Sequence, residues 1–292
     1  DIVGLADGAV KESRERMQAA IRNSGFEFPN ERVLISLSPA DLKKEGAGFD
    51  LPIALSVILS NVPKSVSEKF ITDAVLVMGE LELSGKVRSI KGVHAAISTA
   101  VANGITRCIV PSGNLDEALE VEGALVYGAN SLADAFSALS DVNVFKEKKL
   151  DVKNKDDVEF ADLGNAYRFE DIKGQFKLVR GLQIAAAGGH NVLALGAPGC
   201  GKTMAMQKFP GINPLLSMDE SQSVTRIWSL AGLIKPNEPL IRVPPFRMPH
   251  QTATIEGICG GGVDVRPGEI SLAHNGVLFL DEAGEFRSSV LQ

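Results

Sequence analysis

The sequence Gly196-Ala197-Pro198-Gly199-Cys200-Gly201-Lys202-Thr203 fits the pattern G-x-x-x-x-G-K-[ST] of a phosphate-binding loop. An apolar segment at 191–195 predicts a strand before the loop, and the residues after it, to about Phe209, predict a helix. Glycines in such a loop let backbone N–H groups point at a polyphosphate, and the N-terminus of the helix adds its dipole to the same anion. The alternative is a glycine-rich turn that binds no ligand.

A second motif, near the end of the sequence, favours the nucleotide-binding interpretation. Residues 277–280 are a continuous apolar run, typical of a strand that is buried on both faces of a parallel sheet. The run is followed by Asp281 and Glu282, and the carboxyl ends of such strands are where α/β sheets bind ligands. An Asp-Glu pair alone is more often a solvated strand end. Together with the loop, it predicts a site for ATP and Mg²⁺.

The two motifs give each polar side chain of the predicted site a role. Lys202 is expected to reach the β- and γ-phosphates, and the Thr203 hydroxyl to ligate Mg²⁺ with Asp281 in the outer shell of the ion. Glu282 is expected to polarise the attacking water, so Glu282 and Lys202 are the predicted catalytic residues. The residues predicted to bind the nucleotide around this loop are Gly196, Ala197, Pro198, Gly199, Cys200, Gly201, Lys202, Thr203 and Met204.

The composition predicts a cytoplasmic enzyme without a membrane partner. No apolar run approaches the length of a membrane span, and no signal peptide opens the sequence. The net charge of −6 argues against a uniformly basic nucleic-acid-binding surface but allows a local basic patch. Cys108, Cys200 and Cys259 lie far apart without metal or disulfide spacing, so we expect reduced thiols. The histidines are also scattered, which argues against a structural metal.

A charged, turn-forming segment at 141–158 divides the chain. We therefore expect an N-terminal domain at 1–142, a linker at 143–160 and a second domain at 161–292. Strands and helices alternate in the first domain, which predicts an α/β or α+β fold. The strands are expected at 33–37, 75–78, 87–90, 108–110 and 125–126, and the helices at 9–22, 51–59, 94–102, from 114, and at 132–139.

Several longer stretches carry more specific patterns than the two motifs. In the first domain they are IVGL at 2–5, AVKESRER at 9–16, NSGF at 23–26, PADL at 39–42 and GFDLP at 48–52. In the second domain they are RVPPFR at 242–247, PH at 249–250, GGG at 260–262 and RPGEISLAHNG at 266–276. Over essentially the whole chain, the sequence resembles the magnesium-chelatase-like AAA+ family named YifB or ComM.

The resemblance implies an α/β chain in which a Lon-peptidase-like domain precedes a partial P-loop AAA+ domain of three-layer αβα architecture. Family members have further strands before this sequence, and sensor residues, an arginine finger and a helical lid after Gln292. The chain is therefore expected to be incomplete at both ends and, by itself, weak or inactive as an ATPase. Residues 169–175 resemble the AAA+ segment that lies over the adenine, so Ile172 and Gln175 are candidate base-side contacts.

The Lon-like domain raises the possibility of peptidase activity, which needs a Ser nucleophile and a Lys base. At the positions that match this dyad, the sequence has Ala47 and Gly48 in place of the serine and His94 in place of the lysine. Ser84 and Lys91 are near in sequence but do not match the dyad positions. The first domain is therefore expected to lack peptidase activity and to supply an interaction or assembly surface.

Residues 252–276 resemble an insertion that magnesium chelatases and MCM helicases share, a hairpin that points into the channel of a ring. The glycine run at 260–262 fits a hairpin with tight turns. Arg266 and Arg247 are the local cations that could contact DNA phosphates. The alternative is that both arginines pair with acidic neighbours or serve a subunit interface.

Two functions therefore compete. The resemblance to ComM implies a hexameric, ATP-driven motor that assists branch migration of DNA during the uptake of foreign DNA. The alternative is a chelatase-type ATPase that remodels a protein partner and does not grip DNA. Chelatase ATPase subunits generally lack the Lon-like domain, so its presence favours the DNA motor.

Overall fold

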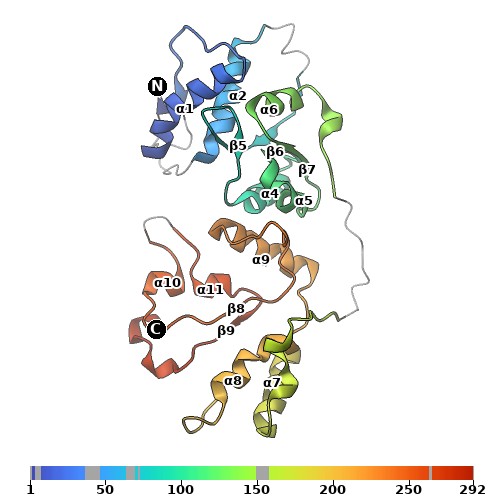
Figure 1. Ribbon diagram of the computed structural model, residues 1–292, viewed down its shortest axis with the longest axis vertical. Helices are drawn as coiled ribbons and strands as arrows, with labels where there is room; N and C mark the ends of the chain where they lie inside the picture. The colour runs from blue at the N-terminus through green and yellow to red at the C-terminus, as the bar shows by residue number, and fades with distance from the viewer. Residues whose placement is uncertain are drawn as a thin grey trace. The chain divides into compact units, whose positions relative to one another are not determined.

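The computed structural model describes residues 2–3, 8–36, 47–63, 70–71, 73–148, 158–262 and 265–291 (Figure 1). It has two compact units. Asp1–Leu150 and Gly232–Pro239 form the first unit, and Asp151–Ala231 and Leu240–Gln292 form the second. The predicted linker at 143–160 includes residues 149–157, which lie outside the described residues, as does the PADL stretch at 39–42.

A three-stranded parallel sheet forms the centre of the first unit. Its strands are β3 (Val75–Val77), β6 (Arg107–Pro111) and β7 (Leu125–Ala129), in the order β3-β6-β7. Parallel neighbours need a crossover connection, and α4 (Val93–Ala102) and α5 (Leu115–Leu119) lie in the two connections. The sequence-based prediction of these three strands is confirmed, and the unit is of mixed α/β type.

Alternate side chains of β6 belong to two separate cores, one on each face of the sheet. Ile109 packs in a core with residues of α1 (Gly8–Asn23), α2 (Asp50–Asn61) and α6 (Leu132–Ala138). Cys108 and Val110 pack in the other core, with residues of α4 and α5. Successive strand residues point to opposite faces, so the apolar sequence of β6 supplies both cores. Burial raises the pKa of the Cys108 thiol to about 12.

The described residues of the first unit also include two pairs of short strands. β1 (Ile2–Val3) pairs in parallel with β2 (Ile35–Ser36), and β4 (Glu80–Leu81) pairs with β5 (Val87–Arg88) in an antiparallel hairpin. β2 and β5 are shorter than the strands predicted at 33–37 and 87–90. For β5 the cause is Asn114, whose side-chain amide accepts a hydrogen bond from the Ile90 N–H and donates one to the Ile90 carbonyl, both at 3.0 Å. These bonds take the place of a strand partner.

Asp50, the first residue of α2, joins three elements of the first unit. Its side chain is 1% exposed, and its Oδ2 accepts hydrogen bonds from Arg16 Nε of α1 at 2.9 Å and from the Leu81 N–H of β4 at 3.2 Å. A buried carboxylate is tolerated when it is paired and hydrogen-bonded. The ion pair therefore fixes how α1, α2 and the β4–β5 hairpin pack together.

In the described part of the second unit, helices outnumber strands, and one parallel strand pair is present. Its described helices are α7 (Phe176–Gly188), α8 (Lys202–Gln207), α9 (Met218–Ala231), α10 (Ile255–Cys259), α11 (Glu269–Leu272) and α12 (Ser288–Leu291). β8 (Phe246–Arg247) pairs in parallel with β9 (Val277–Leu278). In the described part of the chain, no helix is both long enough and apolar enough to cross a bilayer.

The strand predicted at 191–195 is wrong. These residues form no strand, and Leu193 and Leu195 are 80% and 85% exposed. A strand needs a neighbour for its backbone N–H and C=O groups, and in the described part of this unit β8 and β9 pair with each other. The strand predicted at 277–280 forms only over Val277–Leu278, because its partner β8 is also only two residues long. The predicted three-layer αβα architecture is thus reduced here to helices and a two-stranded sheet.

Replacing Asp50 with alanine is expected to destabilise the first unit by about 2–4 kcal/mol, because it removes the buried acceptor of the Arg16 guanidinium and the Leu81 N–H. Hydrogen exchange of α1 and α2 peptides across a urea series measures the loss. Asp116, exposed on α5, is the matched control, and Asp116→Ala is expected to change stability by less than about 0.5 kcal/mol. Equal effects of the two substitutions would contradict this role of Asp50.

Candidate functional site

The phosphate-loop motif folds into a turn that leads directly into a helix. Gly199 and Gly201 have φ values of +76° and +87°, a left-handed conformation that glycine adopts without steric cost. The Cys200 N–H donates to the Ala197 carbonyl at 3.4 Å, and α8 begins at Lys202. The loop thus has the turn and the following helix that the sequence predicts, although the segment before it is not a strand.

Lys202 lies against the main chain of the loop. Its Nζ donates to the carbonyl oxygens of Gly196 at 2.8 Å and Ala197 at 2.9 Å, and lies 3.7 Å from the Cys200 Sγ. An ammonium group has three N–H donors and can exchange carbonyl acceptors for the stronger acceptors of a phosphate. Its place in the curve of the loop fits the role in phosphate binding that the sequence predicts.

Thr203 and Asp281 are 78 residues apart in the sequence and meet in the structure. The Thr203 hydroxyl, on the first turn of α8, donates to Asp281 Oδ2 at 3.0 Å and Oδ1 at 3.2 Å. Hydroxyl and carboxylate oxygens are the ligands that Mg²⁺ prefers, and the ion is usually held by one or two protein groups together with waters and substrate phosphates. The donor set therefore fits Mg²⁺.

Glu282 follows Asp281 in an unusual backbone conformation. Its φ is +51°, and its N–H donates to the Asp281 Oδ1 at 3.1 Å, while its side chain is exposed. Left-handed backbone is uncommon for residues other than glycine and is often found at functional sites. Glu282 thus lies next to the Thr203–Asp281 pair, with its carboxylate open to solvent.

The two candidate base-side residues have different surroundings. Ile172 is 8% exposed and packs with Leu182, Ala205 and Phe209 in the core of the second unit. The exposed Gln175 donates from Nε2 to the main-chain oxygen of Cys200 at 3.1 Å. The sequence did not predict this bond, because no motif links the two positions. Met204, the last residue of the predicted nucleotide-binding set, is 47% exposed on α8.

An ion pair that the sequence analysis missed lies beside these residues. Lys208 Nζ, just after α8, is 3.1 Å from Asp171 Oδ2. The hydrogen bond from Lys208 lowers the pKa of the Asp171 carboxyl below its ordinary value. The pair is therefore intact at neutral pH and is lost only as the pH falls through this lowered pKa. Two oppositely charged residues 37 positions apart carry no local sign that they will meet.

A glycine-rich hairpin joins α10 to α11. Gly261 and Arg266 form an antiparallel bridge, with N–H···O bonds of 2.9 and 3.0 Å in the two directions. Gly260 and Gly268 approach each other so closely that a Cβ on Gly268 would lie 2.2 Å from the Gly260 nitrogen. The described residues at the base of this hairpin thus have the tight geometry that the glycine run predicts. The side chain of Arg266 is exposed there.

Arg247, the other candidate DNA contact, is engaged within the protein. Its Nε and NH2 donate to the two carboxylate oxygens of Glu269 at 2.6 and 2.7 Å. Its guanidinium also lies 5.9 Å from the ring centroid of Trp228, and the Trp228 indole N–H donates to the Leu272 carbonyl at 3.1 Å. The Glu269 carboxylate raises the pKa of Arg247 further. Of the two alternatives for Arg247, these contacts favour pairing with an acidic neighbour.

The residues that the sequence analysis compared with a serine–lysine dyad all lie in the first unit. His94 is fully buried in α4, where its main-chain N–H donates to Glu117 Oε1 at 3.1 Å. The Ser84 hydroxyl bonds to Glu82 at 3.4 Å, and Lys91 is exposed. The Lys86 main-chain N–H donates to Ser84 Oγ at 3.4 Å, but among the described residues of this unit no hydrogen bond joins a serine hydroxyl to a lysine ammonium group. Ala47 and Gly48, in a single 3-10 turn, offer no hydroxyl.

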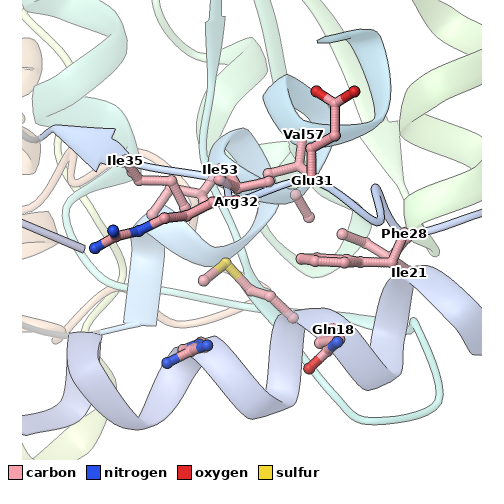
Figure 2. A pocket seen from close by; sticks show the side chains of 12 residues that line it. Gln18, Ile21, Phe28, Glu31, Arg32, Ile35, Ile53 and Val57 are labelled. Atoms are coloured by element: carbon pink, nitrogen blue, oxygen red, sulfur yellow. The ribbon is translucent and has the colours of Figure 1, made fainter. Parts of the chain in front are cut away.

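A cavity of about 230 Å³ in the first unit also has no serine hydroxyl and no lysine ammonium group in its lining. It lies between α1, α2 and the segment at 28–35, and Figure 2 shows the Glu31 and Arg32 head groups extending away from its apolar side chains. The 12 lining residues include no Ser, Thr, Cys, Lys or His. The cavity therefore lacks the hydroxyl, thiol and lysine groups that a serine, threonine or cysteine peptidase would need.

Comparisons with known proteins match both units. The family model described as magnesium chelatase, subunit ChlI, matches residues 168–292, and the model described as subunit ChlI of Mg-chelatase matches residues 1–114. An uncharacterized protein of Mycobacterium tuberculosis is 39% identical over 292 residues, which are 100% of this chain and 56% of that protein. The uncharacterized protein YifB of Escherichia coli is 38% identical over 292 residues, with 99% of this chain and 55% of YifB covered.

The competence protein ComM of Haemophilus influenzae is also similar. It is 36% identical over 297 residues, with 99% of this chain and 56% of ComM covered. The chain thus spans about half the length of the curated relatives that it matches.

Replacing Arg247 with lysine is expected to destabilise the second unit by about 1–2 kcal/mol, because lysine cannot form the paired bonds to Glu269. Trp228 is the chain's only tryptophan, so its fluorescence during unfolding reports on this cluster directly. Arg226, which is exposed and lies on α9 together with Trp228, is the matched control. Arg226→Lys is expected to leave the unfolding midpoint unchanged. An unchanged midpoint for Arg247→Lys would show that the Glu269 pair contributes little.

Proposed function

Because the chain belongs to the magnesium-chelatase-like AAA+ family that includes YifB and ComM, we propose that it binds and hydrolyses ATP with Mg²⁺. The observation that carries the proposal is the contact of Thr203 with Asp281 beside the loop that holds Lys202. These groups come from a helix start and a strand end that are distant in the sequence. Their meeting is what a P-loop NTPase needs to bind phosphates and Mg²⁺ together.

In this mechanism each residue has a limited task. Lys202 gives up its carbonyl contacts and donates to the β- and γ-phosphates, while the loop N–H groups bind the remaining phosphate oxygens. Thr203 and Asp281 would hold Mg²⁺, and the ion would supply positive charge against the phosphates. Glu282 orients a water molecule and accepts its proton, and its exposed carboxylate is accessible for this task.

We further propose that ATP turnover drives the remodelling of DNA, in a branch-migration or helicase-like role in natural transformation. Support comes from a relative named as a competence protein and from the hairpin at the Gly261–Arg266 bridge, which exposes the Arg266 side chain. The partners would be ATP, single-stranded or branched DNA and further copies of the chain in a hexameric ring, in the cytoplasm. The first unit would serve as a non-peptidase interaction domain with the Lon-like fold.

The remodelling of a protein partner is the second candidate function. The matching family models are named for a magnesium chelatase subunit, and Arg247 is paired with Glu269. Both observations fit an ATPase that does not grip DNA. Peptidase activity is the least favoured function, because the Lon-type positions hold Ala47, Gly48 and His94.

In the full-length protein, Glu282→Gln is expected to retain MgATP binding and to lower the turnover rate by about 10²- to 10⁴-fold, because it removes the general base and keeps the size of the side chain. Lys202→Ala is the comparison variant, because it tests nucleotide binding by the loop and not the general base. Its loss of charged hydrogen bonds is expected to weaken binding by about 10- to 100-fold. Titration with a fluorescent ATP analogue and a phosphate-release assay measure the two effects. Turnover of the Glu282→Gln protein at the unsubstituted rate would disprove the role of Glu282.

DNA dependence of turnover separates the two candidate functions. Forked or single-stranded DNA is expected to raise the ATP turnover rate, and the stimulation is expected to fall steeply with salt because phosphate contacts release counterions. Arg266→Ala is expected to reduce the stimulation, whereas Arg226→Ala, on exposed α9 surface, is expected to preserve it. If no DNA changes the rate, the protein-remodelling function is favoured instead.

A further inference from the structure

The segment at 169–175 is attached to the phosphate loop and its helix at both of its ends. Gln175 Nε2 donates to the main-chain oxygen of Cys200, inside the loop, at 3.1 Å. Near the other end of the segment, Asp171 pairs with Lys208, the residue after α8, at 3.1 Å. Between these contacts, Ile172 packs in the same core as Ala205 of α8. The segment is therefore fixed to the start and to the end of the helix.

The chain makes a sharp turn where Gln175 meets the loop. Gly174 and Gln175 have φ values of +68° and +51°, so two consecutive residues are left-handed immediately before α7. Glycine adopts this conformation freely, but glutamine rarely does. A glutamine held in this conformation, with its amide bonded to the loop, suggests that the side chain contributes something that glycine could not.

The acceptor of the Gln175 bond matters for phosphate binding. The Cys200 carbonyl belongs to the same planar peptide unit as the Gly201 N–H, so fixing the direction of the carbonyl also fixes the direction of that N–H. Backbone N–H groups of a phosphate loop act only when they point at the anion. An anchor on the Cys200 oxygen thus sets the orientation of a donor one residue before Lys202.

We propose that Gln175 is a positioning residue that orients the Cys200–Gly201 peptide of the phosphate loop for binding to a polyphosphate. This inference rests on the proposed ATP-binding function. It replaces the base-side contact that the sequence predicts for Gln175. A residue that acts on the loop affects every ligand with a polyphosphate chain, whether or not the ligand carries a base.

The test compares MgATP with magnesium tripolyphosphate, which has the phosphates but no base. Gln175→Ala is expected to weaken the binding of both ligands by the same factor, about 2- to 10-fold, the worth of one hydrogen bond. Gln175→Gly removes the amide and accepts the left-handed backbone, so it is expected to weaken both ligands equally as well. Lys173→Ala is the control, since this exposed side chain bonds only to the Glu170 carbonyl of its own segment among the described contacts.

Isothermal titration of the 292-residue chain, with the unfolding midpoint of each variant measured alongside, decides between the outcomes. Weaker ATP binding with unchanged tripolyphosphate binding would overturn the proposal in favour of a base contact. Unchanged binding of both ligands to Gln175→Ala or Gln175→Gly would overturn it as well. If Lys202→Ala weakens ATP binding as expected while the Gln175 variants bind normally, only this inference fails. If Lys202→Ala binds ATP like the unsubstituted chain, the proposed ATP-binding function fails with it.

Discussion

The hydrogen bonds between Thr203 and Asp281 are the constraint on which the candidate site depends. They connect the first turn of α8 with the residues after β9, across 78 positions of sequence. Neither group alone indicates a cation site, because a threonine in a helix and an aspartate after a strand are common. Brought together, they present several oxygen ligands beside a loop of backbone N–H donors. The surrounding helices and strands hold the two side chains in this position.

The phosphate loop gains its shape largely from side chains that bond to its carbonyl groups. Lys202 binds two of these carbonyls from within the motif, and Gln175 binds a third from outside it. A glycine-rich loop has many accessible conformations, and each such contact reduces their number before a ligand arrives. The glycines allow the fold of the loop, and the polar side chains around it select one conformation.

The sequence predicted the residues with local patterns better than those that depend on distant partners. The loop, the start of α8 and the strands of the first sheet follow from glycine spacing and apolar runs, and the structure contains them. The segment at 191–195 has the composition of a strand, but its pairing depends on neighbours that the described residues do not supply. The pairing of Arg247 with Glu269, 22 positions away, likewise has no local sign.

The three cysteine thiols of the chain differ in burial, and Cys108 is the buried one. This thiol lies in the middle of the first sheet, fully buried and with a pKa raised to about 12, whereas Cys259 is exposed and Cys200 partly so. The thiolate is the reactive form, so an alkylating reagent meets an unreactive group at Cys108 while the sheet is intact. The rate at which Cys108 is alkylated in the native protein therefore measures how often β6 opens to solvent. This rate does not depend on events at the phosphate loop.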